Sequence, residues 1–155
     1  MENTSYVNGL KNMKSFFDKS TSALEESDSN FAPKPEMMTV AQQVAHAAHT
    51  IDWFMDGAFS PKGFDLDFAG NEAKIRRVTS LKEARAWMDR AVDTAIKVIG
   101  AKTAEDLAKP LPEGIMGGMP IGSIVWGMIE HTSHHRGSLA TYTRLLGKVP
   151  PMPYS

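Results

Sequence analysis

The chain has 155 residues, and its 17 basic and 18 acidic side chains give a net charge of -1, which offers no basic excess for nucleic acid or an anionic membrane. It contains five histidines and no cysteine, which excludes disulfides, thiolate metal sites and a cysteine nucleophile. With 42% hydrophobic and 23% charged residues we expect one globular domain over residues 1–155. The start of the chain is polar and no segment approaches ~18 consecutive apolar residues, so the sequence predicts a cytoplasmic protein without a signal peptide or membrane span.

Two amphipathic helices are predicted in the first sixty residues. The first begins near Thr4 or Ser5, and its apolar residues recur at spacings of three, four and seven before a polar run. They are Tyr6, Leu10, Met13, Phe17 and Leu24. After a linker that contains prolines, Thr39 and Gln42 form a capping-box pattern that opens a second helix, which runs to about Gly57. Its predicted buried face consists of Val40, Val44, Ala47, Ile51 and Phe54.

A long connection and a third helix follow. Residues 59–79 contain proline and glycine and read as a crossover, which we expect to be pinned against the bundle by Phe64, Leu66 and Phe68. Ser80 and Glu83 form another capping-box pattern, and the helix that follows stops at Gly100. Its predicted buried face consists of Leu81, Ala84, Met88, Ala91, Ala95 and Val98.

The last third of the chain is predicted to hold a short helical piece over residues 103–108, a loop over 110–120 and a final long helix. Leu111 and Ile115 would pin the loop as an extended arm. The final helix is expected from Pro120 to Leu146, with Gly147 ending it. Four long helices with long connections and no strand pattern predict an all-α four-helix bundle.

All five histidines fall on two of these helices, and the helical angle separates them into two groups. At ~100° per residue, His46 lies at the edge of the apolar stripe of its helix and His49 lies almost opposite it. On the final helix, the stripe lies within ~40° of His135 and ~80° of His131, but ~140° from His134. We therefore expect His46, His131 and His135 to point inward, and the other two to lie on a solvated face or an interface.

The three inward histidines have the arrangement of a metal site. His131 and His135 are four residues apart, so both imidazoles project from one face of a helix and can share one ion. A third imidazole from His46 would complete three ligands and leave positions open to water or substrate, as in catalytic zinc sites. Imidazole also suits nickel, copper and iron. The competing interpretation is that these histidines are solvated or hydrogen-bonded singly.

The sequence around these histidines resembles a known family. The segment EHTSHHRGSL at 130–139, followed by LLGKVPP at 145–151, is similar to the final-helix signature of the DinB-like, or YfiT-like, metal-binding four-helix bundles. The segment TVAQQVAH at 39–46 is similar to the family's second-helix motif, which ends in the first metal-binding histidine. Ser138 departs from the glutamine that is usual in the family.

The resemblance implies a divalent metal, commonly nickel or zinc, held by His46, His131 and His135. Relatives of known activity are mostly thiol-dependent, among them transferases that use bacillithiol or a similar low-molecular-weight thiol and a mycothiol-dependent isomerase, and some are metal-dependent hydrolases. An open metal position could lower the pKa of a bound thiol or water. A chain without cysteine is compatible with a sulfur atom that arrives with the small-molecule substrate.

Four other side chains on the histidine helices are candidates for smaller roles. Arg136 could meet an anionic substrate or a carbonyl, or form a structural salt bridge. Tyr142 could line a pocket or belong to the core. Glu130 points away from the apolar stripe and Asp52 is ambiguous, so the sequence nominates no general base.

Tryptophan and methionine residues suggest contacts. Trp53 and Trp126 lie off the apolar stripes, which predicts an interface or a surface covered by a loop and is the basis for expecting a homodimer. Met116 and Met119 in the glycine-rich loop could touch a ligand or serve only as packing.

Three functions stay open at this stage. The leading hypothesis is a metal-dependent enzyme of the thiol S-transferase kind, with a metal-dependent hydrolase as a variant of it. The alternatives are a non-catalytic bundle that binds a small molecule or a partner, and a structural bundle in which the histidines are incidental.

Overall fold

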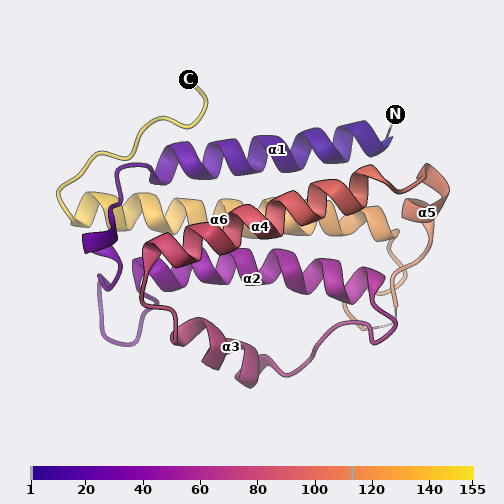
Figure 1. The fold of residues 1–155 in the computed structure, drawn as a ribbon, viewed down its shortest axis with the longest axis horizontal. Coiled ribbons are helices and arrows are strands. Elements are labelled where there is room, and N and C mark those ends of the chain that lie inside the picture. Colours follow the sequence, from indigo (N-terminus) through magenta and orange to yellow (C-terminus); the bar gives the residue numbers. More distant parts are fainter. Residues whose placement is uncertain (1, 113) are drawn as a thin grey trace.

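Four long helices lie side by side and form the bundle in Figure 1. The computed structural model describes residues 2–112 and 114–155. The long helices are α1 (Glu2–Thr21), α2 (Val40–Phe59), α4 (Leu81–Gly100) and α6 (Ile124–Leu145). Each packs against two others, in the order α1, α4, α2, α6 around the bundle. The predicted all-α four-helix bundle is confirmed, and no strand occurs in the described ranges.

The order of the helices explains the long crossover. α2 and α4 are neighbours that run in the same direction, opposite to α1 and α6. A chain that leaves one end of α2 must therefore return along the bundle before it can begin α4. Residues 60–80 make this return beneath α2 in the view of Figure 1.

The sequence signals at the helix ends are realised as hydrogen bonds. The Thr39 hydroxyl accepts from the Gln42 N–H at 3.2 Å and the Gln42 side-chain oxygen accepts from the Thr39 N–H at 3.0 Å, so this capping box is confirmed. Ser80 caps α4 by accepting from the Glu83 N–H at 3.2 Å, but the reciprocal bond from the Ser80 N–H to the Glu83 side chain is not formed, so the second predicted capping box is only half formed. Gly147 ends α6 in the left-handed region, at φ +76°.

Most of the predicted core residues are buried. Fully buried positions on α2, α4 and α6 include Val40, Val44, Ala47, Ile51, Ala84, Ala95, Val125, Met128 and Leu139. Val98, at the end of the predicted face of α4, is half-buried and packs against the core, and its neighbour Ile99 is fully buried. Leu24 is buried but lies beyond α1, which begins at Glu2 and ends at Thr21.

The crossover contains a short helix that the sequence did not predict. α3 (Phe68–Arg76) begins where the Asp67 carboxylate accepts from the Gly70 N–H at 2.9 Å. It buries only Asn71 and Ile75, so it lacks the apolar periodicity that reveals a helix. Phe64 packs against the core as expected, but the prediction was wrong for Leu66 and Phe68, which are 63% and 61% exposed.

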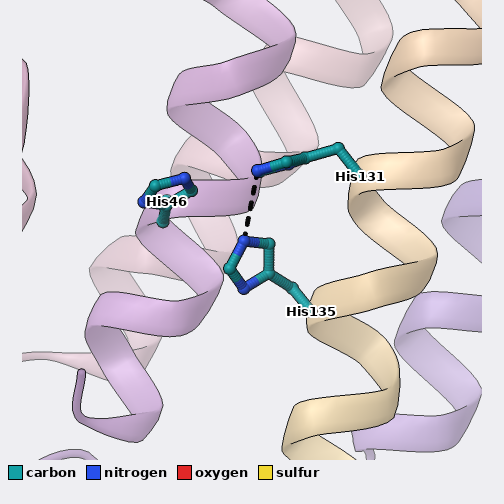
Figure 2. Close-up of side chains that lie close together, drawn as sticks. All are labelled: His46, His131 and His135. Carbon is teal, nitrogen blue, oxygen red and sulfur yellow. Dashed lines mark hydrogen bonds between the residues drawn. The ribbon is translucent and has the colours of Figure 1, made fainter. Parts of the chain in front are cut away.

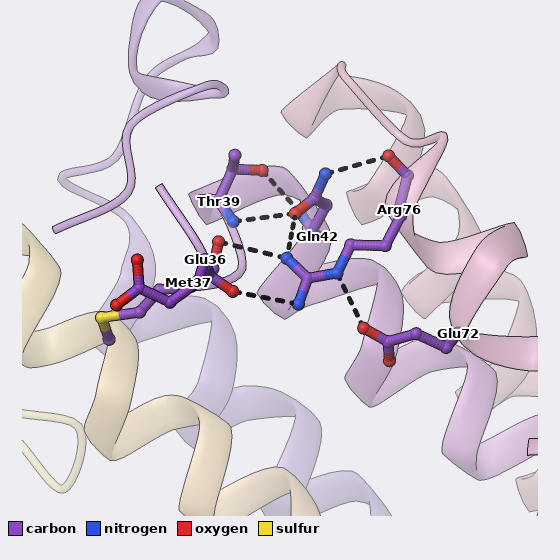
Figure 3. Close-up of polar contacts among 6 residues, drawn as sticks. All are labelled: Glu36, Met37, Thr39, Gln42, Glu72 and Arg76. Atoms are coloured by element: carbon purple, nitrogen blue, oxygen red, sulfur yellow. Dashed lines mark hydrogen bonds and ion pairs between the residues drawn. The ribbon is translucent and has the colours of Figure 1, made fainter. Parts of the chain in front are cut away.

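Arg76 ties the end of α3 to the start of α2 (Figure 3). Its guanidinium donates to the carbonyl oxygens of Glu36 at 3.3 Å and Met37 at 3.2 Å, and to the Glu72 carboxylate at 2.7 Å. The Gln42 amide donates in return to the Arg76 carbonyl at 3.0 Å. α3 is therefore held beside the first turn of α2 by directional contacts, although it buries little apolar surface.

The segment between α4 and α6 is an arm fixed by backbone hydrogen bonds. It holds α5 (Ala104–Ala108) and a loop in which Leu111, 3% exposed, donates its N–H to the Met119 carbonyl at 2.8 Å. Position 113 of the predicted loop lies outside the described residues. A 3-10 turn, Ile121–Ser123, precedes α6, so the predicted start at Pro120 was one turn early. Within the described residues, no helix combines the length and the apolarity that a membrane span needs.

Candidate metal centre

Three histidines from two helices converge inside the bundle. His46 projects from α2, and His131 and His135 project from α6 one turn apart (Figure 2). Each offers a ring nitrogen, and the three nitrogens all lie within 4.8 Å of one another. The predicted inward orientation of these three side chains is confirmed.

The spacing of the imidazoles fits a shared ion. The Nε2 atoms of His131 and His135 are 3.3 Å apart. Two nitrogens at neighbouring corners of a tetrahedron, each about 2.05 Å from a central ion, would be about 3.3 Å apart. The His46 ring lies 5.0 Å from the His131 ring and 4.7 Å from the His135 ring, centroid to centroid. The three rings thus surround one small volume.

Burial keeps these imidazoles neutral. Burial, reinforced by the neighbouring histidines, lowers the pKa of His131 to about 4 and that of His135 to about 3. Burial likewise lowers the pKa of His46, and the Glu72 carboxylate opposes this shift in part. Near neutral pH all three side chains therefore present lone pairs, which is the state that binds a metal ion.

A buried hydrogen-bond chain sets the orientation of His135. The Tyr142 hydroxyl donates to the Met38 carbonyl at 3.0 Å, so its oxygen accepts from the Gln43 amide nitrogen at 3.3 Å. The Gln43 amide oxygen then faces His135 Nδ1 and can only accept, so Nδ1 carries the proton. The His135 Nε2 atom is therefore bare and faces the cluster, which is the tautomer that a metal ligand needs.

Two ring nitrogens in the cluster lack any such support. Among the described residues, the buried Nδ1 atoms of His46 and His131 have no hydrogen-bond partner. Buried polar atoms without partners are uncommon in folded proteins and call for an explanation such as an ion or water. Three neutral imidazoles that converge on one small volume, two of them with a buried nitrogen that has no partner, fit a divalent metal, which would be bound by His46, His131 and His135.

The other two histidines do not belong to the cluster. The Asn71 amide nitrogen donates to Asp65 at 3.2 Å, which leaves its oxygen to accept from His49 Nε2 at 3.3 Å. His49 is therefore turned toward α3, half-buried rather than solvated. His134 is exposed, and its ring meets the His135 ring edge-on at 5.0 Å. The solvated position predicted for His134 is therefore confirmed, whereas His49 lies against α3 and lines a cleft beside the cluster.

Arg136 and Tyr142 have structural roles. Arg136 donates to the Tyr154 hydroxyl at 3.1 Å and lies over the rings of Phe16 and Tyr154, so it holds the C-terminal tail. The structural salt bridge considered for Arg136 is not formed with any described residue. Tyr142 is 3% exposed and reaches the site through Gln43, so it belongs to the core and does not line the pocket.

A cleft of 530 Å³ opens beside the cluster, and His46 and His131 form part of its wall. Its other walls come from α2, α3, α6 and the loop before α6. They are His49, Thr50, Trp53, Phe54, Phe68, Asn71, Glu72, Ile75, Met116, Gly127 and Glu130. Met116 lines the cleft, whereas Met119 does not and is 46% exposed.

The structure shows the environments of Trp53 and Asp52, which the sequence left ambiguous. Trp53 donates its indole N–H to the Asp65 carbonyl at 2.7 Å, so the expected loop covers this tryptophan. Asp52 accepts from the Trp87 indole at 2.6 Å, and burial raises the pKa of its carboxyl group. Trp126, by contrast, is 55% exposed.

Comparison with known proteins identifies the family and agrees with the fold. The profile of the DinB superfamily matches residues 13–139. The chain belongs to the DinB superfamily. Seven solved chains match, among them the crystal structure of a DinB-like protein from Bacillus cereus, with a TM-score of 0.72 and 21% sequence identity over 94% of this chain and 93% of that one. No curated protein matches.

This DinB chain differs from the family motif at Ser138, and the structure shows the consequence. The Ser138 hydroxyl donates to the His134 carbonyl at 3.2 Å, within its own helix. The amide that contacts His135 in this chain belongs to Gln43 on α2. Sequence reasoning missed Gln43, although a polar residue three positions before His46 on a buried helix face was the available signal.

Proposed function

We propose that this DinB protein is a metal-dependent enzyme that activates a low-molecular-weight thiol, or water, at a nickel or zinc ion held by His46, His131 and His135. The observation that carries the proposal is the convergence of three neutral imidazoles at the wall of an open cleft. Three protein ligands leave a coordination position free, whereas a structural zinc site is closed by a fourth.

The three histidines have different positions relative to the cleft, and therefore different roles at the proposed metal site. A bound divalent ion would lower the pKa of a thiol or water at its free position. His135, buried beneath the cleft, is held by Gln43, while His46 and His131 face the cleft and border the place where a second substrate would lie. Trp53, Phe54 and Ile75 make much of the wall apolar, which suits an apolar second substrate.

The proposed transfer is a substitution at carbon. The thiol loses its S–H proton to solvent, a bond forms between sulfur and the electrophilic carbon, and the bond from that carbon to its leaving group breaks. With an aryl chloride, the products are a thioether, chloride and a proton. The electron pair of the new bond comes from sulfur and the pair of the broken bond leaves with chloride, so no oxidant or reductant is needed.

Metal content and turnover test the proposal. Protein purified without chelators and loaded with zinc or nickel should bind about one ion per chain, measured by elemental analysis. It should then couple a small thiol to 1-chloro-2,4-dinitrobenzene faster than the metal-free protein does. Failure to bind either ion would overturn the proposal, and ligand binding without turnover of a thiol or an ester would instead identify a non-catalytic binding protein.

The neighbouring histidines offer matched controls. His131→Ala and His135→Ala should each lose most of the bound metal and the turnover, because two imidazoles hold an ion much less firmly than three. His134→Ala should keep both, since that side chain is exposed and outside the cluster. Equal metal loss in the His134 variant would show that the ion is bound elsewhere.

A further inference from the structure

The cleft beside the three histidines has a rigid aromatic wall. The Trp53 ring meets the Phe54 ring at 5.2 Å and the Phe64 ring at 4.8 Å, and its indole N–H is bound to a backbone carbonyl. Trp53 is therefore fixed on two sides and by its polar atom before any ligand arrives. Phe68 stands at the same cleft with 61% of its surface exposed. Fixed aromatic surface of this kind binds flat apolar groups at little cost in entropy.

Met116 adds a strained residue to the cleft. Its φ of 50° lies in the left-handed region, and no other non-glycine residue in the described ranges has a positive φ. For a residue with a side chain, this conformation costs about 1–2 kcal/mol. The loop is held by the Leu111 to Met119 hydrogen bond and by a 3.0 Å bond from the Met119 N–H to the Met116 carbonyl. These hydrogen bonds hold a residue with a flexible, polarisable side chain at the cleft despite the strain.

The charged residues of the cleft are acidic. Glu72 and Glu130 line it, and within the described ranges no lysine or arginine does. His49 also lines the cleft, with its Nε2 atom turned to the Asn71 amide oxygen at 3.3 Å. Arg76 pairs with Glu72, but its other donors are engaged by backbone carbonyls (Figure 3). Glu130 makes no ion pair with a described residue and is exposed. Lys74 donates to Asn71 at 3.2 Å from a neighbouring hollow.

We infer that this cleft binds an aromatic or similarly flat apolar group that is neutral or cationic, and that it discriminates against anionic groups. An anion on the wall would meet Glu130 without a facing cation, whereas an amine would be attracted to it. The inference deepens the proposed function by naming the class of the second substrate. It concerns the part of the ligand along the wall, because a metal ion would supply positive charge only at the histidine end.

Three naphthalene derivatives test the charge preference in metal-free protein. 2-Naphthylmethanol, 2-naphthylmethylamine and 2-naphthoate have the same ring and differ in charge. Binding at pH 7.5 is followed by NMR of 13C-methyl methionine, with the Met116 signal assigned from the Met116→Leu variant. We expect the alcohol and the amine to shift this signal and to bind at least ten-fold more tightly than the carboxylate. Equal or tighter binding of 2-naphthoate, or no shift with any compound, would overturn the inference.

Replacing Glu130 tests whether this carboxylate causes the preference for a cationic ligand. Glu130→Gln should weaken binding of the amine about two- to five-fold, as expected for a partly exposed charge pair, and leave the alcohol unchanged. Glu83→Gln, which removes an exposed carboxylate on α4 outside the cleft, should change neither. An amine affinity that is unchanged in Glu130→Gln would contradict the assignment of the charge preference to this residue.

The proposed function and the inference about the cleft can be refuted independently of each other. If the metal-loaded protein transfers thiols but 2-naphthoate binds best to the metal-free protein, the inference about the cleft is wrong and the proposed function stands. If the amine and alcohol are preferred but the loaded protein shows no turnover, the proposed function is wrong and the ligand class stands.

Discussion

Replacing Gln43 with leucine tests how His135 is prepared to bind a metal. The Gln43 oxygen accepts the proton of His135 Nδ1, and the hydroxyl of Tyr142, fixed by the Met38 carbonyl, sets the orientation of the amide. Gln43→Leu removes the oxygen that accepts from His135 Nδ1. Gln43 is only 8% exposed, so water does not readily replace that acceptor. The imidazole can then exchange its proton between the two nitrogens or rotate.

The expected loss follows from two effects. An imidazole N–H left buried without an acceptor costs about 1–3 kcal/mol of stability. Removing the group that orients a metal-binding histidine typically lowers metal affinity about 10- to 100-fold, which is about 1.4–2.7 kcal/mol of binding free energy. We expect zinc affinity to fall by that factor in Gln43→Leu. Gln43→Glu should recover most of it, because a carboxylate oxygen also accepts from His135.

Calorimetric titration with zinc measures the affinity, and 15N NMR of the metal-free protein reports which His135 nitrogen carries the proton. The wild type should show the Nδ1–H form, and Gln43→Leu a mixture. Urea unfolding in a chelator separates lost folding from lost orientation. A Gln43→Leu variant with zinc affinity within two-fold of the wild type and an unchanged His135 tautomer would refute the reasoning.

Three further predictions concern stability and assembly. The pKa of His131 falls from an ordinary 6.5 to about 4 on folding, so the unfolded chain takes up the proton first as the pH falls. This residue alone should remove up to roughly 3 kcal/mol of the stability of the metal-free protein between pH 6.5 and pH 4, and His135 and His46 should act in the same direction. Urea unfolding at pH 7 and pH 5 measures the dependence, and His131→Ala should lose part of it. Met116→Gly should keep or raise the melting temperature, since glycine adopts a positive φ without strain, yet weaken binding of 2-naphthylmethanol; a lower melting temperature would show that the side chain is structural. If Trp126 forms the expected homodimer contact, light scattering should give a dimer mass that Trp126→Ser halves, and a monomeric wild type would contradict that expectation.

The sequence determined the features that depend on local periodicity and on helix ends. Apolar residues at helical spacing predict α1, α2 and α4, and the caps Thr39 and Ser80 mark the starts of α2 and α4. Burial of one face and satisfaction of end groups act within a few residues, so a sequence pattern can reveal both. Helical angle also separated His131 and His135 from His134, since positions on one helix are related by a fixed rotation. The DinB motif strengthened the same assignment.

Only the tertiary structure decided the contacts between elements. α3 could not be predicted from the sequence, because hydrogen bonds of Arg76 hold it in place and it buries just two residues. Gln43 has no local signal for its role, because its partners His135 and Tyr142 are 92 and 99 positions away. The acidic, aromatic cleft likewise joins Trp53 on α2 with Met116 in a distant loop. A sequence pattern records what each element buries, whereas orientation, polarity and the shape of a cleft depend on which faces meet when the helices pack.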